Sequence, residues 1–407
     1  MKRCTSVLGA LVLLLTAETA HAQLTMQMTN GWSFTFSGNA HAFLTYEKES
    51  DSGDTATPFG VVGNSADQTR IQTGLLPAFA VFEAKGKEGN TDLTVHFGFA
   101  PEIQCGRGVH DCFGAQIDMR QVYLTAGGSW GQILAGRELA LYGRQNILTD
   151  QTLFGTGATG AGGGALGSGG GTTLGRIGFG YIYPQFVAQF TYSTPGGKPG
   201  QLSIGLFEAD AAALPGVAES PYSKTNIPRV EAEFVYAKKE FKGWLGGLVQ
   251  NTKNPSNGKS VTAPGVSGGL RWANKSFSLT GSGYYGKGLG TTLMFLGGAC
   301  TDETCGSNGS NDLTKSYGYI GQITFTSGKA TVAGSYGASL LDASDTEKAA
   351  GNGFKTENAL ASGGVYYQAT KSLKLVFELN YATTKDKDSS DKKNSSFAPA
   401  VGMMLFF

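Results

Sequence analysis

The sequence predicts an all-β fold, a closed antiparallel barrel of 16 strands that spans a membrane. Apolar and polar residues alternate with period two from residue 32 to the end of the 407-residue chain, and helical periodicity is almost absent. The connections between the predicted strands alternate strictly between long and short. Charged residues make up only 15% of the chain, against roughly 25% in an average globular protein, so the surface is unusually poor in charge.

Composition excludes several other classes. Glycine supplies 62 residues, but proline only 12, and no Gly-X-Y period appears, which excludes collagen and proline-rich disorder. The formal net charge is +1, so the basic excess that nucleic-acid binding requires is missing. We therefore expect no nucleic-acid partner.

The first predicted element is a secretory signal peptide over residues 1–22. Two basic residues follow the initial methionine, an apolar run extends from Val7 to Leu15, and Ala20-His21-Ala22 forms a cleavage site of small residues. The run is too short for a membrane-spanning helix, and no later segment reaches the required length. Cleavage leaves one predicted domain, the barrel over residues 23–407, with 30 basic and 30 acidic side chains from the original 32 and 31.

The first predicted strand shows the two faces most clearly. Its apolar face carries Phe34, Phe36, Ala40, Ala42, Leu44 and Tyr46. Its polar face carries Ser33, Thr35, Ser37, Asn39, His41 and Thr45, with Phe43 as the exception. The same alternation recurs over residues 92–99, 229–236 and 373–381. One face is therefore expected in lipid and the other in a wet lumen.

The strand count depends on the segment around Pro184. Ile177, Phe179, Tyr181 and Tyr183 lie on odd positions, whereas Phe186, Ala188, Phe190 and Tyr192 lie on even ones. A change of phase beside a proline is typical of a bulge inside one strand. Merging the two halves reduces 17 apparent strands to 16, an even number as bacterial outer-membrane barrels require.

Long and short connections are expected at opposite ends of the barrel. The long ones span residues 48–67, 101–113, 139–173, 209–228, 253–263, 288–314, 342–355 and 385–394. The short ones lie near residues 87–90, 127–130, 195–200, 239–242, 274–275, 327–329 and 369–372. This sorting is typical of barrels with short periplasmic turns and long extracellular loops, whereas an exported soluble β-protein would not show it.

Four cysteines remain after Cys4 is cleaved away. They form two close pairs within long connections, Cys105 with Cys112 and Cys300 with Cys305. Cysteines of an exported chain usually form disulfides, and the Cys-x2-Cys spacing of a four-cysteine metal site is missing. We predict that each pair closes a local disulfide.

Strand ends and the C-terminus carry aromatic residues. They include Trp32, Tyr46, Tyr181, Tyr183, Tyr236, Trp244, Trp272, Tyr285, Tyr317 and Tyr319, as interfacial girdles require. The chain ends with Val401, Met403, Leu405 and Phe407 on one parity. In these features the mature chain resembles the Gram-negative porins of the general, trimeric 16-stranded type. The resemblance implies an outer-membrane homotrimer in contact with lipid and lipopolysaccharide, recognised through Phe407 by the assembly machinery.

The stretch from Gly131 to Arg137 resembles the porin strand that leads into the third loop, which in that family folds into the barrel and narrows the pore. The Pro-Glu-Phe-Gly stretch of many such loops is reduced here to Leu153-Phe154-Gly155. The resemblance implies a channel for small hydrophilic solutes and ions. It is closest to an arginine-rich branch that favours small anions.

Ionisable residues in and beside this loop are the candidates for the constriction. They are Arg70, Arg120, Arg144, Asp150, Arg176, Asp118, Glu138 and Arg137. Opposed charges across a narrow, water-filled constriction would create a transverse field that orients polar solutes. Parity places Arg137 on the lipid side, so Arg120, Arg144 and Arg176 rank above it.

Enzymatic readings find little support. Gly155-Thr-Gly-Ala-Thr-Gly160 matches a dinucleotide-binding pattern, but ten of the 17 residues from 155 to 171 are glycine and no helix is expected to follow. A lipase-like hydrolase would need a His beside a Ser, and His41 has only Ser37 on its face, beyond the nearest neighbour. We expect no catalysis, cofactor or metal. The alternative function is a structural or adhesive barrel with a blocked lumen.

Overall fold

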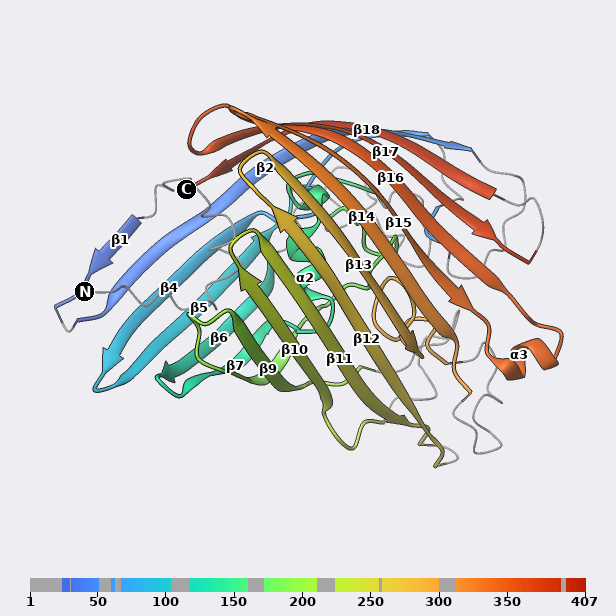
Figure 1. Cartoon of the computed structure of the whole chain (residues 1–407), viewed down its shortest axis with the longest axis horizontal. Coiled ribbons are helices and arrows are strands. Elements are labelled where there is room, and N and C mark those ends of the chain that lie inside the picture. The colour runs from blue at the N-terminus through green and yellow to red at the C-terminus, as the bar shows by residue number, and fades with distance from the viewer. Residues whose placement is uncertain are drawn as a thin grey trace.

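The computed structural model of the chain describes residues 24–29, 31–50, 60–62, 67–103, 117–159, 172–210, 224–255, 258–299, 312–388 and 393–407. Its strands curve around a central space in one antiparallel sheet (Figure 1). The predicted signal peptide and all four remaining cysteines lie outside the described residues, so both remain predictions.

The sheet holds 18 strands. Their bounds are β1 (Leu24–Gln27), β2 (Ser33–Ser50), β3 (Gln68–Gln72), β4 (Phe79–Glu88), β5 (Thr91–Pro101), β6 (Ile117–Gly128), β7 (Gly131–Leu139), β8 (Phe186–Ser193), β9 (Gly200–Phe207), β10 (Arg229–Lys238), β11 (Phe241–Lys253), β12 (Ser260–Ala273), β13 (Phe277–Lys287), β14 (Lys315–Ser327), β15 (Ala330–Asp342), β16 (Lys355–Gln368), β17 (Leu373–Asp386) and β18 (Lys393–Phe406). Short helices are α2 (Arg144–Thr149) and α3 (Asp345–Ala349), with the 3-10 turn η2 (Gln151–Phe154).

The barrel wall itself has 16 strands, as predicted. β3 and β4 both pair with β2, on successive stretches of it, and so form one wall strand that is interrupted at residues 73–78. β1 pairs only with the first four residues of β2 and adds no turn of the wall. Pairing of β18 with β2, from Phe406 opposite Asn39 to Ser395 opposite Ser50, closes the barrel.

One predicted strand is wrong in its extent. Residues 177–183 were expected to continue the strand of residues 186–192, but β8 begins at Phe186, and the preceding residues leave the wall. Phe179 and Tyr181 are almost fully buried inside the barrel. Their alternating pattern reflects burial against structures on several sides rather than a place in the wall.

The sorting of the connections is confirmed. Tight turns join β4 to β5, β6 to β7, β8 to β9 and so on, to β16 and β17, at one end, and the connections expected to be long join the strands at the other. Two of those are shorter than expected, because residues 254–259 and 387–392 are all that separates β11 from β12 and β17 from β18. The long connection after β7 extends to residue 185, beyond the expected 173, because residues 174–185 are not in the wall.

The two faces of the wall also match the predicted alternation. On the first strand Leu44 and Tyr46 are 48% and 41% exposed on the outer face, whereas Thr45 and Glu47 are buried on the inner face. On another part of the wall, the adjacent strands β12, β13 and β14 carry exposed Leu270, Leu279 and Ile323. A continuous apolar surface of this kind would be unfavourable in water and is suited to lipid.

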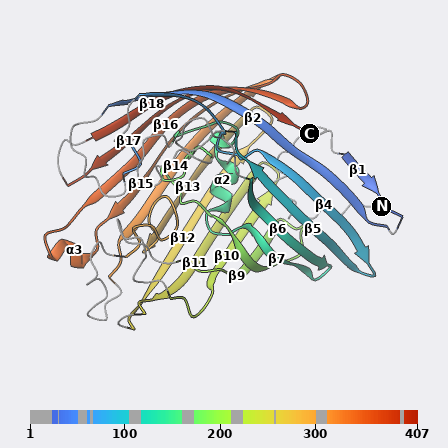
Figure 2. The same cartoon turned by 180° about the vertical axis from the view of Figure 1, so that it is seen from behind.

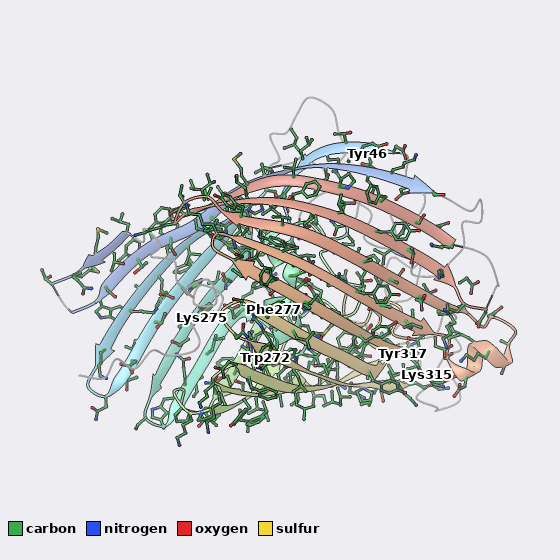
Figure 3. All side chains as sticks on the ribbon, turned by 45° about the horizontal axis from the view of Figure 1, so that its top comes forward. Tyr46, Trp272, Lys275, Phe277, Lys315 and Tyr317 are labelled. Atoms are coloured by element: carbon green, nitrogen blue, oxygen red, sulfur yellow. The ribbon has the colours of Figure 1, made fainter. Side chains whose placement is uncertain are left out.

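Aromatic residues mark both ends of the apolar band (Figure 3). Trp272 and Phe277 flank the tight turn that carries Lys275, and Tyr317 lies near the opposite end of the strands. On β13 the outward Phe277 and Tyr285 are separated by eight positions, which corresponds to about 27 Å along the strand and about 20 Å along the barrel axis at a tilt near 40°. This height is close to the roughly 25 Å apolar band of outer-membrane barrels.

Candidate pore and its constriction

The connection between β7 and β8 runs through the interior of the barrel. We call residues 140–185 the inward loop, of which residues 140–159 and 172–185 are described. Its helix α2 is enclosed by the sheet when the molecule is seen from the front and from behind (Figures 1 and 2). Gly143 precedes α2 with φ of 78°, a left-handed conformation that glycine adopts without strain and that turns the chain into the helix.

Glu378 of β17 fixes the inward loop to the wall. Its carboxylate accepts hydrogen bonds from the Thr156 backbone N–H at 2.8 Å, the Thr156 hydroxyl at 3.0 Å and the Gly157 N–H at 2.9 Å. The Tyr366 hydroxyl donates a fourth, at 2.5 Å. A Cβ on Gly155 would lie 1.9 Å from a Glu378 oxygen, so this close approach requires glycine.

A second contact holds the middle of the loop. Asp150 accepts hydrogen bonds from the Thr152 N–H at 2.9 Å and from the Tyr181 hydroxyl at 2.8 Å, which joins the two arms of the loop. Burial raises the pKa of the Asp150 carboxyl, while the nearby Arg176 charge and these hydrogen bonds act in the opposite direction. The Arg176 guanidinium is fully buried and donates to the Leu360 carbonyl at 3.0 Å.

A third set of contacts fixes the start of the loop to β10. Arg144 donates to Glu233 at 2.5 Å, and the Tyr142 N–H donates to Glu231 at 2.7 Å. Glu231 also pairs with Arg229 at 2.7 Å, and both side chains are fully buried. Buried charges persist only when paired, so these carboxylates give the loop a defined position.

Two other long connections also pack inside the barrel. The Val61 N–H donates to the Asn358 and Thr384 side chains, both at 3.1 Å. On the other side, the Thr292 carbonyl accepts a hydrogen bond from the Tyr183 N–H at 2.9 Å. Described parts of two further connections therefore lie in the lumen beside the inward loop.

A cavity with a volume of about 460 Å³ lies between the inward loop and the wall. It extends to the end of the barrel that carries the tight turns, where Thr326, Gln368 and Lys371 line it. Its position makes it the candidate aqueous path on this side of the constriction.

The lining of the cavity has two chemically different sides. One side is mainly apolar and includes Leu153 and Phe154 of the inward loop, with the Phe154 and Phe406 rings 6.1 Å apart, although the loop also contributes Thr149, Asp150 and Gln151. The opposite side, on β13 to β16, is a row of hydroxyl and amide groups. It consists of Ser278, Thr280, Gln322, Thr324, Thr326, Thr331 and Gln368.

Four cationic residues line the same cavity, Arg120, Arg271, Lys371 and Lys374. Arg120 pairs with Asp118 at 2.8 Å and donates to the Tyr183 hydroxyl at 3.3 Å. Among the described residues, the other three have no carboxylate within ion-pair distance. Among the described lining residues Asp150 is the only carboxylate, and it already accepts hydrogen bonds within the loop. The cavity is therefore electropositive.

The predicted constriction residues are spread over several environments. Arg120 and Asp150 line the cavity. Arg144 and Arg176 lie in the inward loop but are engaged in the contacts described above. Arg70 lies on β3 opposite the inward-facing Thr45 of β2, so it also faces the lumen, but it does not line the cavity.

The remaining three predicted residues lie on β6 and β7. Asp118 pairs with Arg120, and a bulge between β5 and β6 lets both point inward. Glu138 faces inward and accepts from Gln121 at 2.8 Å. Arg137 lies opposite the outward Val122 and is exposed on the outer face, where parity places it.

The sequence ranking missed Arg271, Lys371 and Lys374 as lining residues. Arg271 and Lys374 occupy positions on the polar face of their strands, and this alternation is the only signal in the sequence that marks them as lumen residues. Nothing in the sequence shows that their strands face the cavity rather than another part of the lumen, because that depends on where the inward loop lies.

The two sequence motifs with enzymatic alternatives have structural explanations. Both ring nitrogens of His41 are engaged, with Asn39 at 2.9 Å and with the Gly74 N–H at 3.1 Å. In the glycine-rich pattern, the Thr156 and Gly157 N–H groups donate to Glu378, so a carboxylate occupies the position that a phosphate would need.

The described residues show neither a cluster of metal ligands nor a membrane-spanning helix. Within the described ranges, no three His, Cys, Asp or Glu side chains gather as metal ligands would. No helix in this part of the chain has the length and apolar character needed to cross a membrane.

The fold and the loop-narrowed lumen define the class, a membrane-spanning β-barrel of the porin type. A family model described as Gram-negative porin matches residues 9–389, and the chain belongs to this family. It is an outer-membrane protein of a Gram-negative bacterium, and the family and its fold are those of non-enzymatic channels. No curated protein matches the sequence.

Solved structures support the fold. The outer membrane channel DcaP of Acinetobacter baumannii has a TM-score of 0.68 and 15% identity, over 94% of this chain and 99% of that one. An anion-selective porin from Comamonas acidovorans has a TM-score of 0.60 and 15% identity, over 92% and 100%. The trimer form of OmpT from Vibrio cholerae has a TM-score of 0.56 and 12% identity, over 93% and 100%.

Proposed function

We propose that the protein is a channel for the passive diffusion of small hydrophilic solutes and ions, with a weak preference for anions. The observation that carries this proposal is the electropositive cavity beside the inward loop, in which four cationic side chains face one hydrogen-bonded carboxylate. Fixed positive charges in a narrow, low-dielectric passage raise the local concentration of anions.

Electrostatics favours the anion preference even though the mature chain is predicted to be neutral overall. A permeating ion responds to the charges within a Debye length, about 8 to 10 Å in ordinary salt, rather than to the net charge of the protein. Glu231 and Glu233 are paired with Arg229 and Arg144, and Glu378 is held by neutral hydrogen-bond donors of the inward loop, away from the cavity lining. The lysine and arginine side chains at the cavity that lack acidic partners then determine whether anions or cations are preferred.

Planar-bilayer recording tests the proposal. We expect defined single-channel conductance steps in KCl, and a reversal potential in a salt gradient that indicates a chloride permeability above that of potassium. The preference should decrease at high salt because the fixed charges are screened. Conductance with a cation preference would contradict the anion assignment and leave the channel assignment intact.

Catalysis is not part of the proposed function. The histidine that a hydrolase would need is engaged in structural contacts, because both ring nitrogens of His41 have hydrogen-bond partners. We therefore expect no lipid hydrolysis by the purified protein, and any hydrolysis lost on replacing His41 would contradict this expectation.

We also propose a homotrimer. The OmpT structure from Vibrio cholerae is described as a trimer form. Small outward side chains at Gly38, Ala40 and Ala42 would let a neighbouring wall approach closely, and the seam of residues 32–47 and 395–407 would border the interface. Native mass spectrometry from mild detergent should give a trimer, and a monomer would contradict it.

The outer face of β7 to β9 supports a protein neighbour there as well. Arg137 lies opposite Ala188, whose carbonyl accepts from the Glu208 N–H, so the exposed Arg137 and Glu208 side chains stand in one row about 10 Å apart. Arginine on a lipid-facing wall costs up to about 2–4 kcal/mol at mid-depth. A neighbouring subunit that carries the same arginine and glutamate would supply an opposite charge to each of these two side chains.

A structural or adhesive barrel with a blocked lumen is the second candidate. The packing of Val61 and Thr292 beside the inward loop favours it, because three connections then share the space inside the barrel. Absence of any conductance from correctly folded protein would support this candidate over the channel.

A further inference from the structure

We propose that the cavity beside the inward loop is a binding site for small organic anions with an apolar body, such as aromatic monocarboxylates. The inference rests on the proposed channel function and names a solute class for it. It follows from the two-sided lining of the cavity together with three cations that lack carboxylate partners among the described residues.

The size of the cavity suits a small ligand. Its volume of about 460 Å³ lies in the range of about 300 to 1,000 Å³ that is typical of small-molecule sites. An inorganic ion would leave most of this space to water. A six-membered ring with one carboxylate would contact both sides of the lining at once.

The apolar side is more extensive than ion passage requires. Leu75, Leu153, Phe154, Phe186 and Phe406 line it, contributed by the inward loop, the wall and the segment between β3 and β4. These side chains would shield an apolar body from water, a favourable exchange of roughly 25 cal/mol for each Å². A purely ionic path would gain nothing from such a surface.

The charged side supplies the partner for a carboxylate. Arg271 of β12 and Lys374 of β17 flank the row of hydroxyl groups, and neither has an acidic partner within the described residues. The Nε of Arg271 is buried without a hydrogen-bond acceptor. Lys374 lies over the Phe154 ring at 3.8 Å, so a cation and an aromatic face are presented together.

Hydroxyl groups of the wall would guide the carboxylate between these cations. Ser278 and Thr324 are 2.7 Å apart across neighbouring strands, and Thr326 and Thr331 are 2.9 Å apart. In each pair one hydroxyl donates to the other, and the accepting hydroxyl keeps its own O–H free to donate to a carboxylate oxygen. A neutral sugar would also use these groups, but it would leave the cations without a counter-charge.

Current block in planar bilayers tests the site on the full-length mature protein. In KCl we expect benzoate to reduce or interrupt the chloride current at concentrations where acetate, which lacks the apolar body, and benzyl alcohol, which lacks the charge, do not. The variants R271Q and K374Q should each raise the half-blocking benzoate concentration about tenfold, equivalent to about 1.4 kcal/mol. The variant F154A should weaken block by benzoate and leave the acetate response unchanged.

Lys275→Gln is the matched control, because it removes the same charge from a tight turn at the same end of the barrel, outside the cavity lining. Its benzoate response should equal that of the parent protein. If KCl conductance is normal but benzoate acts no more strongly than acetate and benzyl alcohol, or if R271Q and K374Q behave like K275Q, the site is overturned while the channel stands. If KCl gives no conductance, the channel proposal itself fails.

Discussion

Removing Glu378 should release the inward loop from the wall and change the conductance of the channel. In the parent protein its carboxylate accepts three hydrogen bonds from the loop, two from Thr156 and one from Gly157, at 2.8 to 3.0 Å. In Glu378→Ala these donors lose their acceptor, and lumen water replaces it only in part. At about 1 kcal/mol net for each bond, the contact between the inward loop and the wall loses about 3 kcal/mol of stabilisation. This is a factor of roughly 150 in the preference of the loop for its position against the wall.

Single-channel recording measures the consequence. We expect E378A to show greater open-channel noise and a higher mean conductance than the parent protein, because the loop then samples positions away from the wall. Glu378→Gln keeps one acceptor oxygen and should give an intermediate result.

A control separates loop release from general damage. Glu357→Ala removes a carboxylate from the neighbouring strand β16. Glu357 does not contact the inward loop and pairs instead with Lys387, with 3.5 Å between the charged atoms, so this variant should leave noise and conductance unchanged. Thermal unfolding followed by circular dichroism should show that both variants keep the barrel. Parent-like conductance and noise in a folded E378A would refute the view that this carboxylate holds the constriction.

Three further predictions follow from the placement of charges and cysteines. Replacing Arg120 and Arg176 together by Ala should shift the reversal potential toward cation permeation, and the shift should be smaller at high salt. R120A alone should account for the shift, because Arg176 is fully buried. An unchanged reversal potential in the double variant would show that neither arginine belongs to the constriction. Arg137→Glu should lower the trimer fraction in native mass spectrometry, whereas Lys287→Glu on the outer face of β13 should not; equal effects would exclude β7 from the interface. Mass spectrometry of the unreduced mature protein should recover two local disulfides, and cross-paired peptides would contradict them. The expected pairs are Cys105 with Cys112 and Cys300 with Cys305.

The buried charges of the inward loop explain why its position is defined inside a wet lumen. A surface ion pair contributes little, but Arg229 and Glu231 are fully buried and tie β10 to the loop through the Tyr142 N–H. Breaking one partner would leave the other charge buried and unpaired, which is far more costly than losing an exposed pair. The loop is therefore held by specific contacts.

The sequence by itself determined the wall. Period-two alternation depends only on the geometry of a single strand, so residues such as Leu44 and Thr45 show their faces without knowledge of any neighbour. Connection lengths are equally local, and they distinguish the two ends of the barrel. The count of 16 was correct, although residues 177–183 are absent from the wall and do not extend β8. The outward position of Arg137 follows from the same parity.

Only the tertiary structure decided what occupies the lumen. Residues 177–183 alternate like a strand, yet they lie inside the barrel, because a segment buried on several sides satisfies the same pattern as one half-buried in a wall. The contact of Thr156 with Glu378 joins residues 222 positions apart in the chain. No local pattern encodes such a pairing, so the lining of the cavity by Arg271 and Lys374 depends on how the closed barrel places distant strands around the inward loop.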